Sequence, residues 1–339
     1  MCWNLRGKQY CIENVQYTKE EYYEKLKEYD MSSHANLEKL KTRFNEILQT
    51  QTVHRENFTV NTYGSKGTYL ANCNNCQNVF AWEDSENCVN CLRGRTSKDC
   101  IDLVGNWIME VSGNSSCCTE SYGIKYSSWS QARYSEYLDN CLEVEYCFGC
   151  VSLRKKKYCI LNKQYTKEEY EALREKIVSD MRARGEYGKM LPYSLGLCDY
   201  NFTTAAIYMP EVTKEYVEER GGYWSDGVED SVEGKLATEL PDNISEVDAG
   251  IAKQPLVCPE TGWRYNISPD EYSFLSRKKI ALPRVHFDVR TKRRMHTIAP
   301  WRGNIRTCMY CEKSVTAYYP ESWGYQKIAC EDCYKREIN

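Results

Sequence analysis

Short apolar runs lead into polar, helix-forming stretches at two places in the chain, and the pattern is clearest from residue 158 onward. Residues 158–160 form a strand-like Tyr-Cys-Ile run. The chain then reaches Thr166, which is followed three residues later by Glu169. This is the capping box that begins a helix, because each side chain satisfies a free N–H group of the first turn. The pattern predicts a helix from 166 to about 184.

The same pattern occurs twice, which indicates a duplicated module. Residues 2–22 (CWNLRGKQYCIENVQYTKEEY) align without a gap on residues 150–170 (CVSLRKKKYCILNKQYTKEEY) and are identical at 15 of 21 positions. The first copy predicts a helix from about 18 to about 50, broken near residues 32–33. A long cysteine-rich stretch precedes only the second copy. Either the first module lacks its N-terminal part, or the chain starts inside a longer protein.

Between the two copies, an Asn-Cys or Asp-Cys pair recurs every 12 residues. The pairs are Asn75-Cys76, Asn87-Cys88 and Asp99-Cys100. A fixed short period without helical periodicity is typical of a β-solenoid, in which coils stack about 4.8 Å apart and like residues form ladders. Cysteine is small and apolar when buried, so it suits the inside of a narrow coil. We therefore predict a cysteine-laddered β-solenoid.

A competing interpretation places a zinc ion in this stretch. Cys73, Cys76, Cys88 and Cys91 have the spacing C-x2-C-x11-C-x2-C, which fits one tetrahedral site. The 12-residue period continues through Cys100, and a set of four ligands does not explain that continuation. The period favours buried thiols, and both interpretations stay open on the sequence.

The strongest chemical signal lies near the C-terminus. Cys308-x2-Cys311 and Cys330-x2-Cys333 are separated by 18 residues. Two such knuckles place four thiolates on one tetrahedral ion, as in zinc ribbons. We predict zinc as the cofactor. The site is expected to be structural, because four protein ligands leave no position for a substrate or a water molecule.

Cys258 and His286 are a weaker candidate for a second metal site. Each lacks a second ligand three residues further on, where the chain has Thr and Val. Two ligands do not complete a tetrahedron. His54 follows the first predicted helix and is expected to be an ordinary surface histidine.

The net charge of −3 conceals two opposite segments. Residues 211–248 hold 12 acidic side chains against three basic ones, and residues 277–313 hold 11 basic side chains against two acidic ones. A basic helix beside a zinc ribbon, with Trp301 nearby, could contact phosphates and stack on bases. The candidate contacts are Arg290, Lys292, Arg293, Arg294, Arg302 and Arg306. Alternatively, the basic segment docks on the acidic segment of the same chain, or both segments face solvent. An overall pI near 6.0 favours these two interpretations over nucleic-acid binding.

The composition and the absence of common catalytic motifs exclude several classes of function. The 339 residues have a mean hydropathy of −0.68, and no stretch approaches the roughly 20 apolar residues of a membrane helix. The first residues lack the apolar run of a signal peptide, and 19 cysteines with several C-x-x-C pairs favour thiols and metal sites over disulfides. We predict a cytoplasmic protein, or one in a particle assembled in the cytoplasm. No P-loop, HExxH, G-x-S-x-G or dinucleotide pattern occurs, so we predict no enzymatic activity and identify no small-molecule substrate.

A set of motifs carries a resemblance to a known family. They are LRKKKYCILNKQYTKEEY (153–170), LPYSLGLCDYN (191–201), CPETGWRY (258–265), LPRVHFDVRTKRRM (282–295) and the four C-terminal cysteines. In these motifs taken together, the chain resembles uncharacterised cysteine-rich repeat proteins with a C-terminal zinc ribbon, which come from environmental bacterial and large-virus genomes. The motifs cover most of the chain after residue 60. The resemblance implies a shared architecture and no activity.

Together these patterns predict an α+β fold: cysteine-laddered β-solenoid repeats with flanking helices and a C-terminal zinc ribbon. The predicted regions are a truncated first module (1–59), a second module of solenoid and helix (60–190), an acidic connecting region (191–254), and a basic helical segment with the ribbon (255–339).

We expect a non-catalytic, zinc-binding scaffold that contacts other proteins, in a large assembly such as a virion or ribonucleoprotein. The alternative is a nucleic-acid-binding protein that acts through the basic C-terminal region. A third class is a thiol-based metal store or redox sensor, which requires reactive cysteines.

Overall fold

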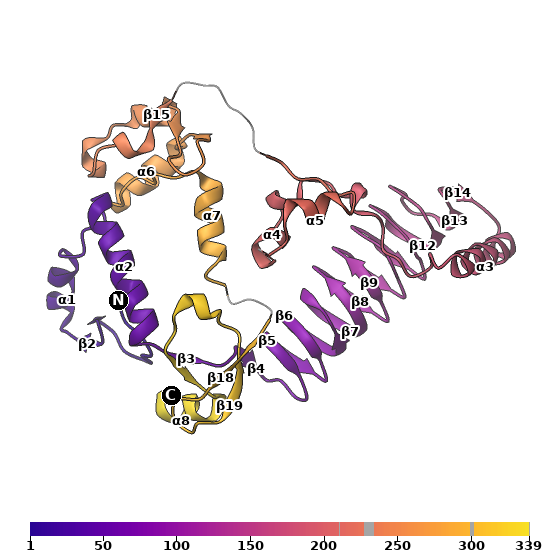
Figure 1. Cartoon of the computed structure of the whole chain (residues 1–339), viewed down its shortest axis with the longest axis horizontal. Coiled ribbons are helices and arrows are strands. Elements are labelled where there is room, and N and C mark those ends of the chain that lie inside the picture. Colours follow the sequence, from indigo (N-terminus) through magenta and orange to yellow (C-terminus); the bar gives the residue numbers. More distant parts are fainter. Residues whose placement is uncertain (210, 227–233, 299–301, 339) are drawn as a thin grey trace. The chain divides into compact units, whose positions relative to one another are not determined.

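The computed structural model describes residues 1–209, 211–226, 234–298 and 302–338 (Figure 1). The chain forms two compact units. One comprises residues 57–199 and 213–223, and the other comprises residues 1–56, 200–212 and 224–339. The fold is mixed α+β, as predicted.

A β-solenoid of about eight turns forms most of the first unit, which confirms the predicted repeat fold. Its strands stack side by side in Figure 1, and those inside the stack pair in parallel with a 12-residue offset at most positions, for example Cys88 with Cys100. The strands are β4 (Thr59–Val60), β5 (Lys66–Asn74), β6 (Gln77–Val89), β7 (Leu92–Val104), β8 (Trp107–Glu110), β9 (Gly113–Ser116), β10 (Thr119–Tyr122), β11 (Gln131–Arg133), β12 (Leu142–Phe148), β13 (Lys157–Ile160) and β14 (Lys163–Gln164).

Each 12-residue coil is built from units of three residues. Along the coil that begins at Asn75, every third residue has a positive φ, near +50°, in the order Asn75, Asn78, Ala81 and Asp84. The residue that follows each of these points inward and is buried. The left-handed conformation turns the chain at each corner, and Asn and Asp tolerate it best among residues with a side chain.

The Asn and Asp residues before the ladder cysteines also bond to one another between coils. The Asn75 amide donates to Asn87 Oδ1 at 2.8 Å, and the Asn87 amide donates to Asp99 Oδ1 at 2.7 Å. This explains why an Asn or Asp precedes each of these cysteines. The side chain at each solvent-facing corner forms a hydrogen bond with the corresponding side chain of the adjacent coil.

The inside of the solenoid is filled by small and apolar side chains. Cys76, Cys88 and Cys100 stack in one ladder, and each is at most 2% exposed. Serine hydroxyls fill other inward positions and accept hydrogen bonds from the next coil, as Ser85 Oγ does from the Ser97 N–H at 3.0 Å. These buried hydroxyl groups are therefore paired, whereas the buried Trp82 Nε1 has no hydrogen-bond partner.

Helix α3 (Lys167–Ala183) packs against the last coils of the solenoid. Its capping box is present as predicted, with Glu169 N–H donating to Thr166 Oγ1. Tyr170 and Val178 of the helix pack on Phe148 and Ile160. The unit also contains the 3-10 helix η1 (Tyr193–Leu195) and helix α5 (Lys214–Glu218).

The second unit begins with the first copy of the duplicated motif. It contains β1 (Cys11–Ile12), β2 (Val15–Gln16), α1 (Lys19–Leu26) and α2 (His34–Thr50). The predicted helix is therefore broken between α1 and α2, near the expected residues. Ser33 begins α2 by accepting a hydrogen bond from the Asn36 N–H.

The middle of this unit packs short elements around Leu256, Cys258 and Ile267, all 0% exposed. Ser268 caps α6 and Pro269 is its first residue, as expected for a helix start. The elements are η2 (Tyr200–Phe202), α4 (Ala205–Tyr208), β15 (Lys235–Leu236), η3 (Ala237–Glu239), η4 (Ile244–Glu246), η5 (Ala249–Lys253), β16 (Leu256–Val257), β17 (Arg264–Tyr265), α6 (Pro269–Lys278) and α7 (Phe287–Met295).

The C-terminal part combines β18 (Asn304–Thr307), β19 (Ser314–Ala317), η6 (Glu321–Trp323), β20 (Lys327–Ala329) and α8 (Glu331–Ile338) with a distant strand. Strand β3 (Val53–Arg55) pairs in parallel with β20. The surface assignment of His54 is therefore wrong. The residue is 9% exposed, and its ring bonds through Nε2 to the Leu48 carbonyl at 2.7 Å and stacks on Tyr325 at 3.7 Å between ring centres. We call β3 and residues 304–338 the metal domain.

Candidate metal centre

Two turns of the metal domain present the four C-terminal cysteines. Cys308 and Cys311 lie between β18 and β19, whereas Cys330 follows β20 and Cys333 lies in the first turn of α8. Backbone hydrogen bonds shape the first turn: the Cys308 N–H donates to the Lys313 carbonyl, and the Glu312 N–H donates to the Cys308 carbonyl, both at 2.9 Å. The sequence places ligands at turns, and the strands bring the two turns together.

The four sulfur atoms converge on one point. All lie within 4.8 Å of one another, and the Cys311 and Cys330 sulfurs are 3.8 Å apart. All four are free thiols. In a tetrahedral site with metal–sulfur bonds of about 2.3 Å, the sulfurs are about 3.8 Å apart. The group could therefore hold one metal ion.

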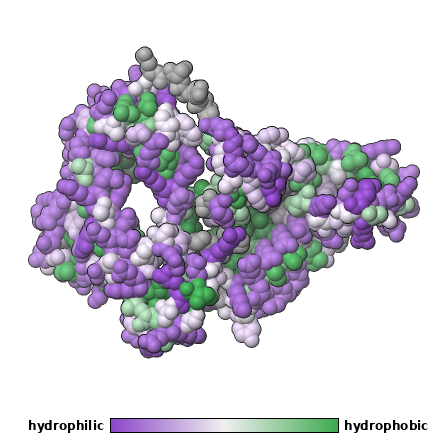
Figure 2. Space-filling view, viewed as in Figure 1, coloured by the Kyte–Doolittle hydropathy of each residue, from purple (hydrophilic) through white to green (hydrophobic). Residues whose placement is uncertain are grey.

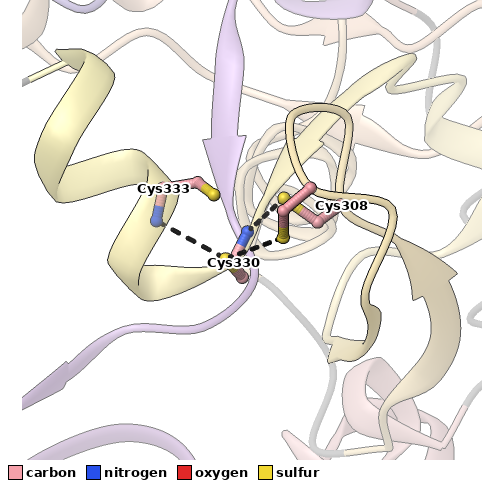
Figure 3. Close-up of side chains that lie close together, drawn as sticks. Cys308, Cys330 and Cys333 are labelled. Atoms are coloured by element: carbon pink, nitrogen blue, oxygen red, sulfur yellow. Dashed lines mark hydrogen bonds between the residues drawn. The ribbon is translucent and has the colours of Figure 1, made fainter.

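Nearby donors favour the thiolate form of one ligand. Although burial opposes ionisation of Cys308, the backbone N–H groups of Cys330, Cys311 and Tyr310 lower its pKa to about 6. Figure 3 shows Cys308, Cys330 and Cys333 with the N–H···S contacts among them, including the Cys330 N–H to Cys308 Sγ at 3.3 Å. Such hydrogen bonds orient the ligands of a metal.

The other sulfurs show why a cation fits this group. The neighbouring Cys330 sulfur raises the pKa of Cys333 to about 12, and the pKa of Cys330 is also raised. Without a cation, the sulfurs compete for negative charge, because adjacent thiolates repel one another. A divalent ion would remove this conflict by binding all four as thiolates. With four protein ligands, the site has no open position for chemistry.

The Cys258 turn has the same backbone as the Cys308 turn but a different side chain at the second ligand position. The Cys258 N–H donates to the Trp263 carbonyl and the Gly262 N–H donates to the Cys258 carbonyl, both at 2.9 Å. Thr261 stands where the other turn has a cysteine. Gly262 has φ +71°, which matches the +60° of Glu312.

His286 lies next to this turn. Although burial opposes ionisation of Cys258, the His286 backbone N–H and the Thr261 hydroxyl hold the pKa of Cys258 below its ordinary value. The His286 ring caps α7, with Nδ1 accepting from the Asp288 N–H at 3.1 Å. Within residues 1–209, 211–226, 234–298 and 302–338, no third ligand atom joins this pair. The second metal site stays a prediction.

The solenoid cysteines are arranged differently from the C-terminal four. Cys73, Cys76, Cys88 and Cys91 are buried at inward positions, and no three of their sulfurs gather with the closeness of the C-terminal group in the described part of the chain. Burial raises the pKa of Cys118, in the same core, to about 12. The arrangement matches the thiol-ladder interpretation.

Most of the predicted phosphate contacts are engaged by partners in their own unit. Arg290 Nη1 lies 2.5 Å from Glu271, and Lys292 lies 2.9 Å from Asp288. Arg293 pairs with Glu260. The acidic partners of these three α7 cations lie outside the 211–248 segment, so the sequence did not indicate the pairing.

The remaining candidates also have contacts within this unit. Arg302 pairs with Glu211 at 3.1 Å. Arg306 donates to the Tyr325 carbonyl at 3.0 Å, and Arg294 donates to Thr291 Oγ1 at 3.1 Å. Trp301 lies outside the described residues. The basic residues therefore form a surface that is partly neutralised from within.

Searches for similar proteins add little. No family model and no curated protein matches the chain. Among solved structures, a Bacillus cereus protein provisionally described as an acetyltransferase aligns with 14% identity over 40% of this chain and 95% of that one, with a TM-score of 0.13. A score this low supports no argument about fold or activity. In the described residues, no helix has the length and apolar character needed to cross a membrane.

Proposed function

We propose that the protein is a non-catalytic scaffold whose solenoid binds other proteins and whose metal domain is held together by zinc. The observation that carries the proposal is one solenoid coil with several large apolar side chains at its outward positions. Ile101, Val104, Trp107, Ile108 and Val111 are each 47–50% exposed on it. They lie on different sides of the coil, with Trp107 and Ile108 adjacent on β8, and adjacent exposed apolar side chains are typical of protein contact sites.

The surface beside this coil supports the same proposal. An open groove of about 990 Å³ runs along the solenoid and is lined by Ile108, Tyr122 and Tyr134 together with charged residues of neighbouring coils. Figure 2 shows hydrophobic surface over the solenoid among hydrophilic residues. Aromatic residues surrounded by a polar rim are the usual composition of protein interfaces.

Zinc is the metal that best fits the C-terminal site. Four cysteine sulfurs at tetrahedral spacing favour zinc or iron, and zinc has no redox chemistry and serves structural sites of this type. The pairing of Arg290, Lys292 and Arg293 with acidic side chains weighs toward protein rather than nucleic acid as the partner.

The proposal is tested by isolating complexes from the source cells at moderate salt, with and without nuclease. We expect wild-type protein to retain stoichiometric partner proteins after nuclease treatment. The double variant Trp107→Glu/Ile108→Glu should lose them, because two buried charges oppose the contact. Val151→Glu, at a 50% exposed position on another coil, is the matched control and should retain them.

Circular dichroism establishes that the variants keep the solenoid. Partners that are retained by the double variant, or that are released by nuclease, contradict the proposal. The second outcome would support the nucleic-acid alternative.

A further inference from the structure

A cleft of about 880 Å³ lies within the second unit and is lined by α2, α6, α7 and residues 280–285. Contacts in the same unit hold α2 at both ends. At its start, the Ala35 N–H donates to the Asp242 carboxylate at 2.9 Å, and near its end the Gln49 side chain donates to the Trp323 carbonyl at 3.0 Å. Sites for small organic ligands typically measure about 300–1,000 Å³. The cleft therefore has a fixed wall and the size of a ligand site.

Apolar side chains form much of the cleft surface. Leu37 and Phe44 come from α2, Leu275 comes from α6, and Ile280 and Leu282 lie between α6 and α7. Phe44 remains 45% exposed beside them. An apolar cleft of this kind favours a ligand that has an apolar body.

The charged side chains of the cleft are mostly basic. Five Lys or Arg side chains and three Glu side chains line it. Arg290 and Arg294 lie one turn apart on α7, so they present two cations to the same part of the wall. Arg294 donates to Thr291 Oγ1 at 3.1 Å and forms no salt bridge within the described residues. Arg290 pairs with Glu271, but its buried Nε–H has no acceptor among those residues.

Positive charge also reaches the α2 wall. Burial and the positive charge of Arg284 lower the pKa of His34, the first residue of α2. Arg284 donates to backbone carbonyls, such as that of Leu240 at 3.0 Å, and forms no salt bridge with a described residue. The cleft thus combines an apolar surface with uncompensated positive charge. Carboxylate and phosphate groups match such a site, because arginine binds them through paired, charge-assisted hydrogen bonds.

We propose that this cleft binds a small organic anion that carries an apolar body. Its carboxylate or phosphate group is held by Arg290 and Arg294, and its apolar body packs on Leu37, Phe44 and Leu275. The bound anion supplies the acceptor that the Arg290 Nε–H lacks and neutralises Arg294, so charge complementarity selects it over a neutral ligand. The site goes beyond the scaffold function and belongs to a different unit from the solenoid surface.

Isothermal titration calorimetry of the full chain with four probes tests the site. Decanoate and decyl phosphate combine an apolar body with an anionic group, whereas decanol lacks the charge and inorganic phosphate lacks the apolar body. All probes are kept below the concentrations at which they form micelles. We expect at least one of the two amphiphilic anions to bind at least about tenfold more tightly than decanol or inorganic phosphate, because each of these lacks one of the two contacts. Whichever anion binds more tightly identifies the group as a phosphate or a carboxylate.

Matched variants locate the charged and the apolar contact. Arg294→Gln should weaken binding of the tighter anion about tenfold, whereas Lys292→Gln removes a cation of the same helix that does not line the cleft and should leave the affinity unchanged. Phe44→Ala should also weaken binding, and Phe287→Ala, at a 61% exposed position outside the cleft, should not. Circular dichroism establishes that the variants keep the fold.

Hydrogen exchange places the bound probe on the molecule. The tighter anion should slow exchange in α2 and α7 and leave the solenoid strands unchanged. Equal affinities for decanol and both anions, an unchanged affinity in folded Arg294→Gln, or no binding of any probe would overturn the inference. The scaffold proposal is tested separately through Trp107 and Ile108, so either proposal can fail alone.

Discussion

The chain uses cysteine in two opposite ways. In the solenoid, sulfurs stack one per inward position; burial raises the pKa of Cys118 to about 12, whereas a hydrogen bond with Cys147 lowers the pKa of Cys150 to about 7. In the metal domain, four sulfurs converge within 4.8 Å, and backbone N–H groups lower the pKa of Cys308 to about 6. The same side chain therefore serves as a small buried group in one region and could serve as a metal ligand in the other.

The difference lies in the backbone around each sulfur. A solenoid corner directs its neighbour inward, where carbonyl groups accept weak S–H bonds, as Ser97 does from Cys88 at 3.5 Å. A backbone N–H also reaches a solenoid sulfur, from Asn162 to Cys150 at 3.4 Å, but the C-terminal turns direct several N–H groups at the one sulfur of Cys308. Spacing alone does not separate the two, because C-x2-C occurs in both regions.

The largest effect is expected on removing a metal ligand. Cys330→Ser, or a strong chelator, should unfold the metal domain, because a structural zinc ion contributes on the order of 10 kcal/mol to the fold of such a domain. Hydrogen exchange should rise across β18–β20 and α8 and leave the solenoid protected. Cys198→Ser, at an exposed cysteine, is the control and should change neither region. Unchanged protection in Cys330→Ser would refute a structural metal.

A charge inside the solenoid should have the next largest effect. Cys88→Asp places a carboxylate at a 0% exposed position and should cost more than about 3 kcal/mol of unfolding free energy. Cys88→Ala keeps the position apolar and should cost only about 1 kcal/mol. Thermal melts followed by circular dichroism give both values. Equal losses would show that Cys88 is not an apolar core residue.

Alkaline pH should weaken the solenoid. The Cys118 thiol ionises near pH 9 in the unfolded chain and at about 12 in the folded one. Its contribution to stability is therefore complete below pH 9 and is lost as the pH rises from 9 toward 12. The melting temperature in reducing buffer should fall between pH 9 and 12, and Cys118→Ala should reduce the fall. A flat profile would contradict burial of the thiols.

The corner ladders should have the smallest effect. Asn87→Ala removes two side-chain amide hydrogen bonds and a residue suited to φ +53°. It should lower the free energy of unfolding by about 1–2 kcal/mol. Asn87→Gly keeps the conformation and should cost less. The same melts compare the two variants, and equal stability of Asn87→Ala and wild type would mean that the ladder contributes nothing.

Local signals in the sequence predicted much of this architecture. The capping boxes at Thr18 and Thr166, the 12-residue period and the two C-x-x-C turns each correspond to an element found in the structure. Each depends on residues that are near one another in the chain. The three-residue period was not predicted, because residues such as Ala81 and Tyr69 occupy corners as well as asparagine and aspartate.

Contacts between distant segments could not be predicted. Strand β3 is a Val-His-Arg segment without a pattern, and its partner β20 lies more than 270 residues further on. His54 was misplaced for this reason. The pairing of Arg290 with Glu271 depends on how α6 and α7 pack, which charge counts along the sequence do not show.

The most direct test of the two uses of cysteine is the metal content of the purified chain. Wild-type protein and the double variant Cys76→Ala/Cys88→Ala should each contain one zinc ion per chain, and Cys311→Ser should contain markedly less. A second ion that disappears in Cys76→Ala/Cys88→Ala would show that the solenoid cysteines are ligands, and would contradict the account.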